Sequence, residues 1–573
     1  MDYDDHGRVS HTTNIIDYLV SSTVYNDSAS TYYQYNSDGT LEYEETNLPG
    51  SGSIKSEYGY DELLRVTGVS RTAGSFDHDI SYTYYSQSST TANLISTYKS
   101  TVNGIATTFG YTYDSKGNIT KITNSGDDDI TYTYDDLGQL TKEVKGNVTK
   151  TYTYDNAGNI TSIITTTEIE SLDPDPGFTP IIKAVTLPTT TTTTKTLSYT
   201  NSQWGDLLTS YDGTAITYDE IGNPLSYYNG SSYTFTWEGR RLVGATRGSN
   251  TMSFTYNDDG IRTSKTADGV TTTYYVNGGQ IVAEKTDTRT IVYIYDASGA
   301  PIGMMYRTTS YAKDVWDTFW YEKNLQGDII AIYNASGTKV ATYTYSDAWG
   351  NHSVSYSNGG GSTGAQYNPF RYRGYYYDSD LGMYYLQSRY YDAKICRFIS
   401  ADGYVSTGQG ILGNNMFAYC GNNPVNHVDP TGEIPIGIII VIIMSVVLLS
   451  SCSQNEPTEE QIQNAIYAAE KAQFNKREEN GYTTLDIEIS TQDTMDIVDF
   501  IAYDYYFDTL YDRYLEEADL LGIDNGKLMN EKHIKWEFQI HVIGQFLNHS
   551  SADPAELNVE ETFWTIARRV FSK

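Results

Sequence analysis

Two separated Asp-Gly turns contain the residues of this sequence whose types could do chemistry. They are Asp402-Gly403 and Asp429-Pro430-Thr431-Gly432, and they follow a segment rich in tyrosine and arginine. Two carboxylates that share one proton can act as acid and base on one bond, and a nearby guanidinium can orient one of them. Residues 368–432 are therefore the candidate site for acid-base chemistry.

The elements that must position these turns are β-hairpins, because most of the first 430 residues follow a repeat. The unit is a short strand that ends in Tyr, then Asp or Asn, then a Gly turn, then a second strand. Five successive anchors are 19 or 20 residues apart, which is one hairpin per repeat: Tyr218, Trp237, Tyr256, Tyr275 and Tyr295. Earlier copies have their tyrosine at Tyr3, Tyr35, Tyr113, Tyr134 and Tyr154.

Residue choice within the repeat predicts a mainly β protein. Residues 130–134 and 150–154 alternate Tyr with Thr or another residue, which places the rings on one face of a strand. The Asp or Asn accepts hydrogen bonds within its own turn, and Gly supplies the positive φ. The chain has 55 Tyr and 48 Gly in 573 residues, so such turns and strands can recur throughout. The aspartates of these turns are predicted to be structural, not catalytic.

Charge and composition limit the function classes. The net charge of -34 argues against a surface that coats nucleic acid, which needs a basic footprint. Three cysteines are too few and too scattered for a disulfide framework, and they leave the redox compartment open: Cys396, Cys420 and Cys452. Residues 3–7 already read as a repeat, without the charged start and apolar run of a secretory signal peptide. Residues 171–200, with several prolines and a threonine run, predict a long surface loop.

The segment 368–432 resembles the core of the RHS-repeat family, the YD-repeat shell proteins that include polymorphic bacterial toxins. The resemblance covers about 65 residues and rests on these motifs: Asn368-Pro369-Phe370-Arg371-Tyr372-Arg373-Gly374, Tyr377-Asp378, Tyr384-Tyr385, Ser388-Arg389-Tyr390-Tyr391-Asp392, Arg397-Phe398-Ile399 and Asn422-Asn423-Pro424-Val425-Asn426. It implies that the hairpins spiral into a hollow shell that this core closes. The expected organisation is a repeat shell over 1–367 and a core domain over 368–432.

The resemblance also implies an aspartyl-type autoprotease that cuts just after the second turn. Carried over position by position, its residues are Arg389, Asp402 and Asp429. This sequence departs from the family pattern in three places. The first turn lacks the usual Pro, Glu433 stands where cleaved relatives carry Leu, and positions 393 and 396 lack the usual Pro and Gly. Two interpretations stay open: an active autoprotease, or a structural plug in which Arg389 is a buried arginine bonded to carbonyls and carboxylates.

After Gly432 the composition changes. Residues 434–455 carry no charge, and three interpretations compete: a transmembrane helix, a segment buried against the shell lumen, or an internal lipoprotein signal ending at Cys452. Residues 456–573 predict a small, mostly helical, acidic domain of unassigned activity. No cofactor or metal site is predicted, because three histidines recur every eight residues and so lie on different sides of a helix: His533, His541 and His549.

These features predict a shell protein that encloses or delivers a variable C-terminal toxin in interbacterial competition. Its expected location is secreted or at the cell surface, and its expected partners are an immunity protein, an export machinery and a membrane contacted through 434–455. The alternative is a cell-surface or membrane-tethered YD-repeat protein that binds partners or carbohydrate and never cleaves.

Overall fold

The computed structural model describes residues 2–4, 8–20, 23–50, 52–87, 90–169, 189–277, 279–312, 315–357, 364–403, 412–433 and 436–437. The chain divides into two units, Met1–Glu456 and Pro457–Lys573, and every described residue belongs to the first. The helical domain predicted over 456–573 lies outside the described residues, as does all of 434–455 except 436–437. Among the residues that are described, no helix is long and apolar enough to cross a membrane.

Seventeen strands form the first sheet, and each pairs antiparallel with its neighbours along the chain. We call it sheet one. Its strands are β1 (Asp2–Tyr3), β2 (Val9–Val20), β3 (Thr23–Tyr35), β4 (Leu41–Asn47), β5 (Ser53–Tyr60), β6 (Val66–Ala73), β7 (Phe76–Gln87), β8 (Thr90–Val102), β9 (Ile105–Tyr113), β10 (Ile119–Asn124), β11 (Ile130–Tyr134), β12 (Leu140–Lys145), β13 (Val148–Tyr154), β14 (Ile160–Ile169), β15 (Thr189–Ser198), β16 (Ser210–Tyr211) and β17 (Thr214–Ala215).

Fourteen further strands form sheet two, again in chain order. They are β18 (Thr217–Tyr218), β19 (Pro224–Tyr228), β20 (Ser232–Glu238), β21 (Arg241–Arg247), β22 (Asn250–Tyr256), β23 (Arg262–Ala267), β24 (Val270–Asn277), β25 (Gln280–Lys285), β26 (Arg289–Tyr295), β27 (Pro301–Thr308), β28 (Asp317–Lys323), β29 (Ile329–Asn334), β30 (Lys339–Tyr345) and β31 (His352–Tyr356).

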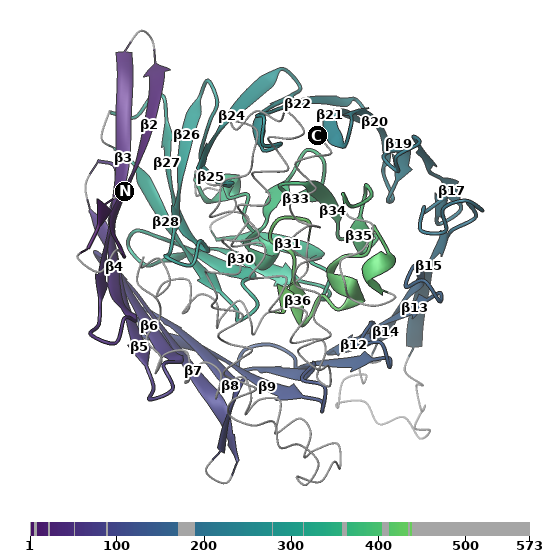
Figure 1. Ribbon diagram of the computed structural model, residues 1–573, viewed down its shortest axis with the longest axis horizontal. Helices are drawn as coiled ribbons and strands as arrows, with labels where there is room; N and C mark the ends of the chain where they lie inside the picture. Colours follow the sequence, from purple (N-terminus) through teal and green to yellow (C-terminus); the bar gives the residue numbers. More distant parts are fainter. Residues whose placement is uncertain are drawn as a thin grey trace, which may run out of the picture. The chain divides into compact units, whose positions relative to one another are not determined.

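The core segment that follows has short elements. Its sheet contains β32 (Tyr376–Asp378), β33 (Met383–Leu386), β34 (Arg389–Asp392) and β35 (Arg397–Phe398), and β36 (His427–Val428) pairs with β37 (Ile436–Gly437). Four 3₁₀ turns complete it: Ala365–Tyr367, Tyr372–Gly374, Leu412–Asn414 and Cys420–Asn422. Figure 1 shows the strands of both sheets curving around these core elements, and inner-face side chains of both sheets join the core in one hydrophobic cluster. The predicted mainly β fold, in which hairpin repeats surround the core, is confirmed.

The repeat turns form as the sequence predicts. Asp135 Oδ1 accepts the backbone N–H groups of Leu137 (3.0 Å) and Gln139 (2.9 Å). Gly138 in this turn has a φ of 82°, which glycine adopts without strain. Asp155 makes the same two contacts with the second and fourth residues after it. These aspartates hold turns, as their pattern predicts.

The tyrosine before each turn ties its repeat to the preceding one. In many repeats its hydroxyl donates to a backbone carbonyl 14 to 18 residues earlier, and Tyr35 does the same with the carbonyl of Val9, 26 residues earlier. The ring is buried or partly buried beside that strand. A phenylalanine would pack in the same place but would leave that carbonyl without its donor, which accounts for the choice of tyrosine. The pairs include Tyr113–Ile95, Tyr134–Ile119, Tyr154–Leu140, Tyr256–Leu242 and Tyr295–Ile281.

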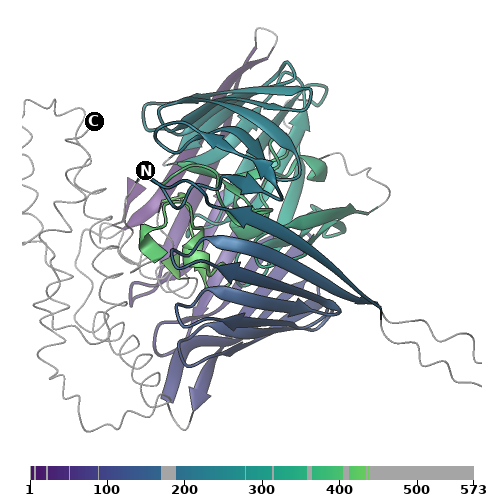
Figure 2. The same ribbon diagram turned by 90° about the vertical axis from the view of Figure 1, so that its right-hand side faces the viewer.

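The prediction of a long surface loop over 171–200 is wrong for residues 189–198. Residues 189–198 form β15, which pairs with β14 residue by residue from Ser162↔Thr196 to Ile169↔Thr189. The blue strands of this hairpin extend past their neighbours in Figure 2. Threonine is β-branched and favours an extended backbone, so the threonine run continues the sheet once no proline interrupts it. Residues 170–188 lie outside the described part.

Sheets one and two also touch each other directly along a polar seam. Arg71 on β6 pairs with Asp296, which follows β26, at 2.8 Å. On β28, Glu322 accepts hydrogen bonds from Ser100 on β8 (3.1 Å) and from Tyr333 on β29 (2.8 Å). All five side chains are largely buried. Each charged group in the seam therefore needs its ion-pair or hydrogen-bond partner to offset the loss of water.

The seam predicts a pH-dependent stability. Burial raises the pKa of Glu44, on β4, to about 8, and the nearby Asp296 adds to the effect. An unfolded glutamate has a pKa of about 4.3, so this group's contribution to stability is complete below that pH and is lost as the pH rises through 8, at up to about 1.4 kcal/mol per unit. Glu44→Gln should flatten the fall of the urea unfolding midpoint between pH 5 and 8. Glu42→Gln, on the exposed face of β4, is the control. If the urea midpoint fell equally steeply with pH in Glu44→Gln and in the parent, Glu44 would not be the group that titrates.

Candidate active site

The core sheet places Arg389 at the start of β34, immediately after the tight turn that joins β33 to β34. Its side chain is 6% exposed. The guanidinium carbon lies 3.6 Å from the centre of the Phe398 ring on β35. Stacking on an aromatic face fixes the plane of a guanidinium, so its five N–H groups point in set directions.

Arg389 contacts the other two predicted site residues. Its Nη2 lies 2.7 Å from Asp402 Oδ2 and 3.7 Å from Asp429 Oδ2. Its Nε donates to the carbonyl oxygen of Gly432, and its Nη1 donates to that of Met416 at 3.0 Å. The structure thus brings both carboxylates to one guanidinium, which also binds the carbonyl oxygen of Gly432.

The second turn folds over its own aspartate. Asp429 Oδ1 accepts the backbone N–H groups of Gly432 (2.9 Å) and Glu433 (3.0 Å). The N–H of Asp429 itself donates to the hydroxyl of Tyr375 at 2.7 Å. The carboxyl of Asp429 and the guanidinium of Arg389 therefore contact the two ends of one peptide bond, Gly432–Glu433.

The turn is pressed against the β33–β34 hairpin. Thr431 O accepts both the N–H (3.1 Å) and the hydroxyl (2.6 Å) of Ser388. Gly432 has a φ of 75°, and a Cβ there would lie 2.7 Å from Ser388 Oγ and 2.8 Å from the carbonyl oxygen of Leu386. Glycine is required here by both conformation and space.

Electrostatics distinguish Asp429 from Asp378, another buried aspartate of the core. Burial raises the pKa of Asp429 to about 6; the nearby Asp402 carboxylate also raises it, while Arg389 and the two turn N–H groups lower it. At Asp378 burial acts in the same direction, but Lys265 and Arg262 overcome it and lower the pKa to about 2. Asp429 shares a single cation with a second carboxylate, so it holds its proton to higher pH.

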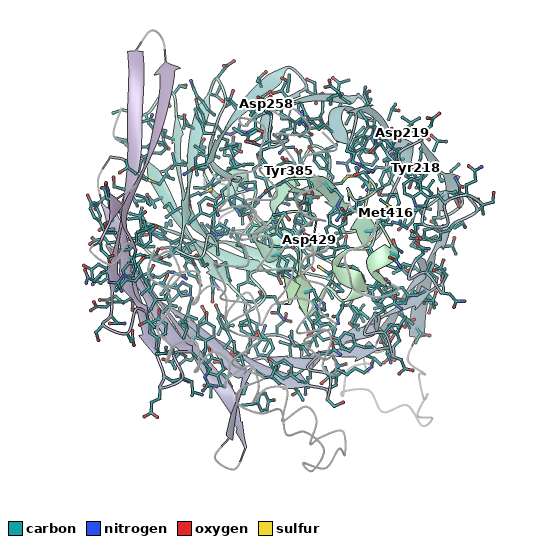
Figure 3. All side chains as sticks on the ribbon, viewed as in Figure 1. Tyr218, Asp219, Asp258, Tyr385, Met416 and Asp429 are labelled. Atoms are coloured by element: carbon teal, nitrogen blue, oxygen red, sulfur yellow. The ribbon has the colours of Figure 1, made fainter. Side chains whose placement is uncertain are left out.

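Asp402 comes from a different part of the core. It is 3% exposed, and its N–H donates to Met416 O at 2.8 Å. The same carbonyl therefore holds Asp402 and Arg389 together. Figure 3 shows Met416 and Asp429 among the core elements, whereas Asp219 and Asp258 of the repeat turns lie on the surrounding ring of strands.

A small cavity of about 20 Å³ lies beside Arg389. Its lining includes Ser388 and Ser400 of the core and Arg240 and Tyr256 of sheet two. That volume holds roughly one water molecule. Neither Asp402, Asp429 nor Gly432 lines it, so this cavity is separate from the carboxylate pair.

Some site contacts carry no signal in the sequence. Met416 and Thr431 contribute only their backbone carbonyls, so any residue type would serve. Tyr375 is one of many tyrosines in its segment, and Ser388 lies in an ordinary turn motif. The carbonyl of Gly432 as a ligand of Arg389 is likewise invisible before the fold is known.

Comparison with known proteins places these features in a family. A family model described as RHS Repeat matches residues 113–148 and 134–168. The tRNA3(Ser)-specific nuclease WapA of Bacillus spizizenii is 34% identical over 234 residues, which cover 39% of this chain and 9% of that protein. Double-stranded DNA deaminase toxin A of Burkholderia cenocepacia is 27% identical over 256 residues, 40% of this chain and 17% of that protein.

Among solved structures, the crystal structure of TcdB2-TccC3-Cdc42 is similar with a TM-score of 0.51 and 18% identity, over 78% of this chain and 24% of that one. This similarity concerns the fold alone. The chain thus spans a small part of the length of the curated relatives and of this structure. The tyrosine-turn repeats, the matched model and the shared fold together show that the chain belongs to the RHS-repeat family.

Proposed function

We propose that this chain is the shell and core of an RHS-repeat toxin and that it cuts its own Gly432–Glu433 bond. The observation that carries the proposal is the contact set at that bond. Arg389 donates to the Gly432 carbonyl oxygen, and the Asp429 carboxyl lies 3.0 Å from the Glu433 nitrogen. A structural plug needs buried hydrogen bonds, but it does not need them at the two ends of a single peptide bond.

The reaction assigns one role to each residue. Asp402, as carboxylate, takes a proton from water while the water oxygen attacks the Gly432 carbonyl carbon. Arg389 stabilises the negative charge that develops on the carbonyl oxygen. Asp429, in its protonated form, gives its proton to the Glu433 nitrogen as the C–N bond breaks. The products are a carboxyl group at Gly432 and an amine at Glu433.

Cleavage at this bond would release the segment after Gly432 from the core. Two similar proteins are a tRNA nuclease and a DNA deaminase toxin, and the similarity to each covers well under half of this chain. We extend the role of toxin delivery to this protein, with residues 433–573 as the released segment that carries the effector, acting outside the cell that makes it.

The size of the protein on a denaturing gel tests the proposal. An intact chain has a mass of 64.1 kDa. Self-cleavage predicts a shell fragment that ends at Gly432 and a second fragment whose first residue is Glu433, which mass spectrometry identifies. A single full-length band after prolonged incubation of the folded protein would instead leave the plug.

The cut should depend on pH with a midpoint near 6. Asp429 has a pKa of about 6, and only its protonated form can act as the acid. The rate constant should approach a plateau below pH 6 and fall about tenfold per unit above it. Full-length chain kept unfolded in urea and then diluted into buffers between pH 5.5 and 8 would show this as a time course of bands. A rate that rises with pH would exclude Asp429 as the acid.

A further inference from the structure

Four asparagines of the core bind the turns of three successive repeats in sheet one. We call them the asparagine clamp, and they are Asn415, Asn422, Asn423 and Asn426. Each uses its side-chain amide. The segment that carries them, residues 412–427, crosses the turns that follow β9, β11 and β13.

The contacts proceed turn by turn. Asn423 Nδ2 donates to Asn118 Oδ1 at 3.1 Å, and Asn426 Oδ1 accepts the N–H of Ile119 at 2.8 Å. The remaining contacts are Asn422 Nδ2 to Gln139 Oε1 (2.9 Å) and to Gly158 O (2.7 Å), Asn415 Nδ2 to Asn159 Oδ1 (2.9 Å) and to Ala157 O (3.2 Å), and Asn426 Nδ2 to Tyr134 OH (3.1 Å).

The repeat turns present their oxygens to the clamp in one way. Asn118, Gln139 and Asn159 each occupy the fifth position of a turn, where the side-chain NH₂ donates to the carboxylate of the turn's own aspartate. That bond turns the amide so that its oxygen faces the core. Asn223 occupies the fifth position of another turn and makes the same bond to Asp219, yet its buried Oδ1 has no hydrogen-bond partner in the described part of the chain.

Both ends of the clamp lead directly to the candidate active site. Asn415 precedes Met416, whose carbonyl oxygen accepts from Arg389 and from the N–H of Asp402. Asn426 lies three residues before Asp429. A shift of the clamp segment against the repeat turns would therefore move one carboxylate relative to the other.

We propose that the asparagine clamp positions the self-cleavage site, so that the Gly432–Glu433 bond is cut only after the three repeat turns have docked on the core. This inference rests on the proposed function. The clamp residues and their turn partners are positioning residues, since none of them contacts the bond that breaks. Misplacement of reacting groups by about 1 Å can slow a reaction by about a hundredfold, which makes such a device effective.

The test compares equivalent turn positions in the full-length chain. Asn118→Ala and Asn159→Ala remove a clamp partner together with the turn's own bond to aspartate. Asn223→Ala removes the same turn bond, together with a bond to the Gly239 carbonyl oxygen, where no clamp contact exists in the described part of the chain. After dilution from urea, the first two variants should cleave at least about tenfold more slowly than the parent and show a shifted pH midpoint, whereas Asn223→Ala should cleave within about twofold of the parent with the parent midpoint.

Asn118→Gln provides the rescue, because Gln139 shows that glutamine fits this position in a neighbouring turn, and it should recover most of the rate. Parent-like rates in Asn118→Ala and Asn159→Ala would overturn the inference and leave the cleavage proposal intact. Equal slowing in Asn223→Ala would also overturn it, since general destabilisation would then suffice. A parent chain that never cleaves would overturn the proposed function and this inference with it.

Discussion

Asp429→Asn is expected to abolish self-cleavage and leave a full-length chain. Asparagine keeps the side-chain oxygen that accepts the Gly432 and Glu433 N–H groups, so the turn should persist. It loses the proton that the departing nitrogen needs. Loss of a general acid costs about 10²- to 10⁴-fold, which turns a cut completed within an hour into one that takes days or longer. A denaturing gel followed for several days measures this.

Two further variants separate chemistry from folding. Asp61→Asn changes an aspartate with the same turn role in the turn between β5 and β6 of sheet one, and it should cleave like the parent. Asp402→Asn should resemble Asp429→Asn, because it removes the other carboxylate. An unchanged β-rich circular-dichroism spectrum in all three would show that the fold is intact. Rapid cleavage of Asp429→Asn would refute the assigned acid.

The strands and turns of this fold could be predicted from the sequence, because the residues that determine each repeat lie within about twenty positions of one another. The tyrosine-threonine alternation determines the buried face of a strand, and the Asp and Gly of a turn determine where it reverses. The candidate trio Arg389, Asp402 and Asp429 came from the resemblance of the core. The structure brings these three residues together.

Contacts between distant parts were not readable in the same way. Nothing in the neighbourhood of Arg71 indicates that its partner is Asp296, 225 positions later. The asparagine clamp is hidden for a related reason, since an asparagine in a core loop has many ordinary turn roles. The loop prediction for the threonine run was wrong for a different reason. Its composition resembles a linker, but its β-branched residues favour an extended backbone and pair with β14.

Polar groups carry much of the recognition between the core and the sheets. Arg373 pairs with Asp328 at 3.3 Å and also donates to the carbonyl oxygen of Pro424, so it joins sheet two to the clamp segment. Asp392 accepts from Tyr227 and Asn229 of sheet two. Such bonds are lost entirely when the register shifts by one repeat, whereas apolar contacts between similar tyrosines would survive the shift. A repeat sheet needs this discrimination, because its units resemble one another.

Arg262→Met should give the largest loss of stability of any single substitution in the described repeats. Arg262 is fully buried; its Nη1 donates to Asp378 Oδ2 at 2.7 Å, and its guanidinium lies 4.4 Å from the centre of the Tyr385 ring. Methionine fills similar space but leaves Asp378 with Lys265 alone, at 2.9 Å. Removing one partner of a buried ion pair costs about 3 to 5 kcal/mol, which urea unfolding or the yield of soluble protein would register.

The physical reason is the loss of one of the two cations that pair with the Asp378 carboxylate, rather than the lost packing of the arginine side chain, and a double variant distinguishes the two. Arg262→Met combined with Asp378→Asn removes both charges, so it should recover part of the stability lost in Arg262→Met. Arg241→Met, an exposed arginine at the start of β21, should cost less than about 0.5 kcal/mol. If the double variant were less stable than Arg262→Met, the two effects would simply add. Packing around the arginine, not its charge, would then hold the core against sheet two.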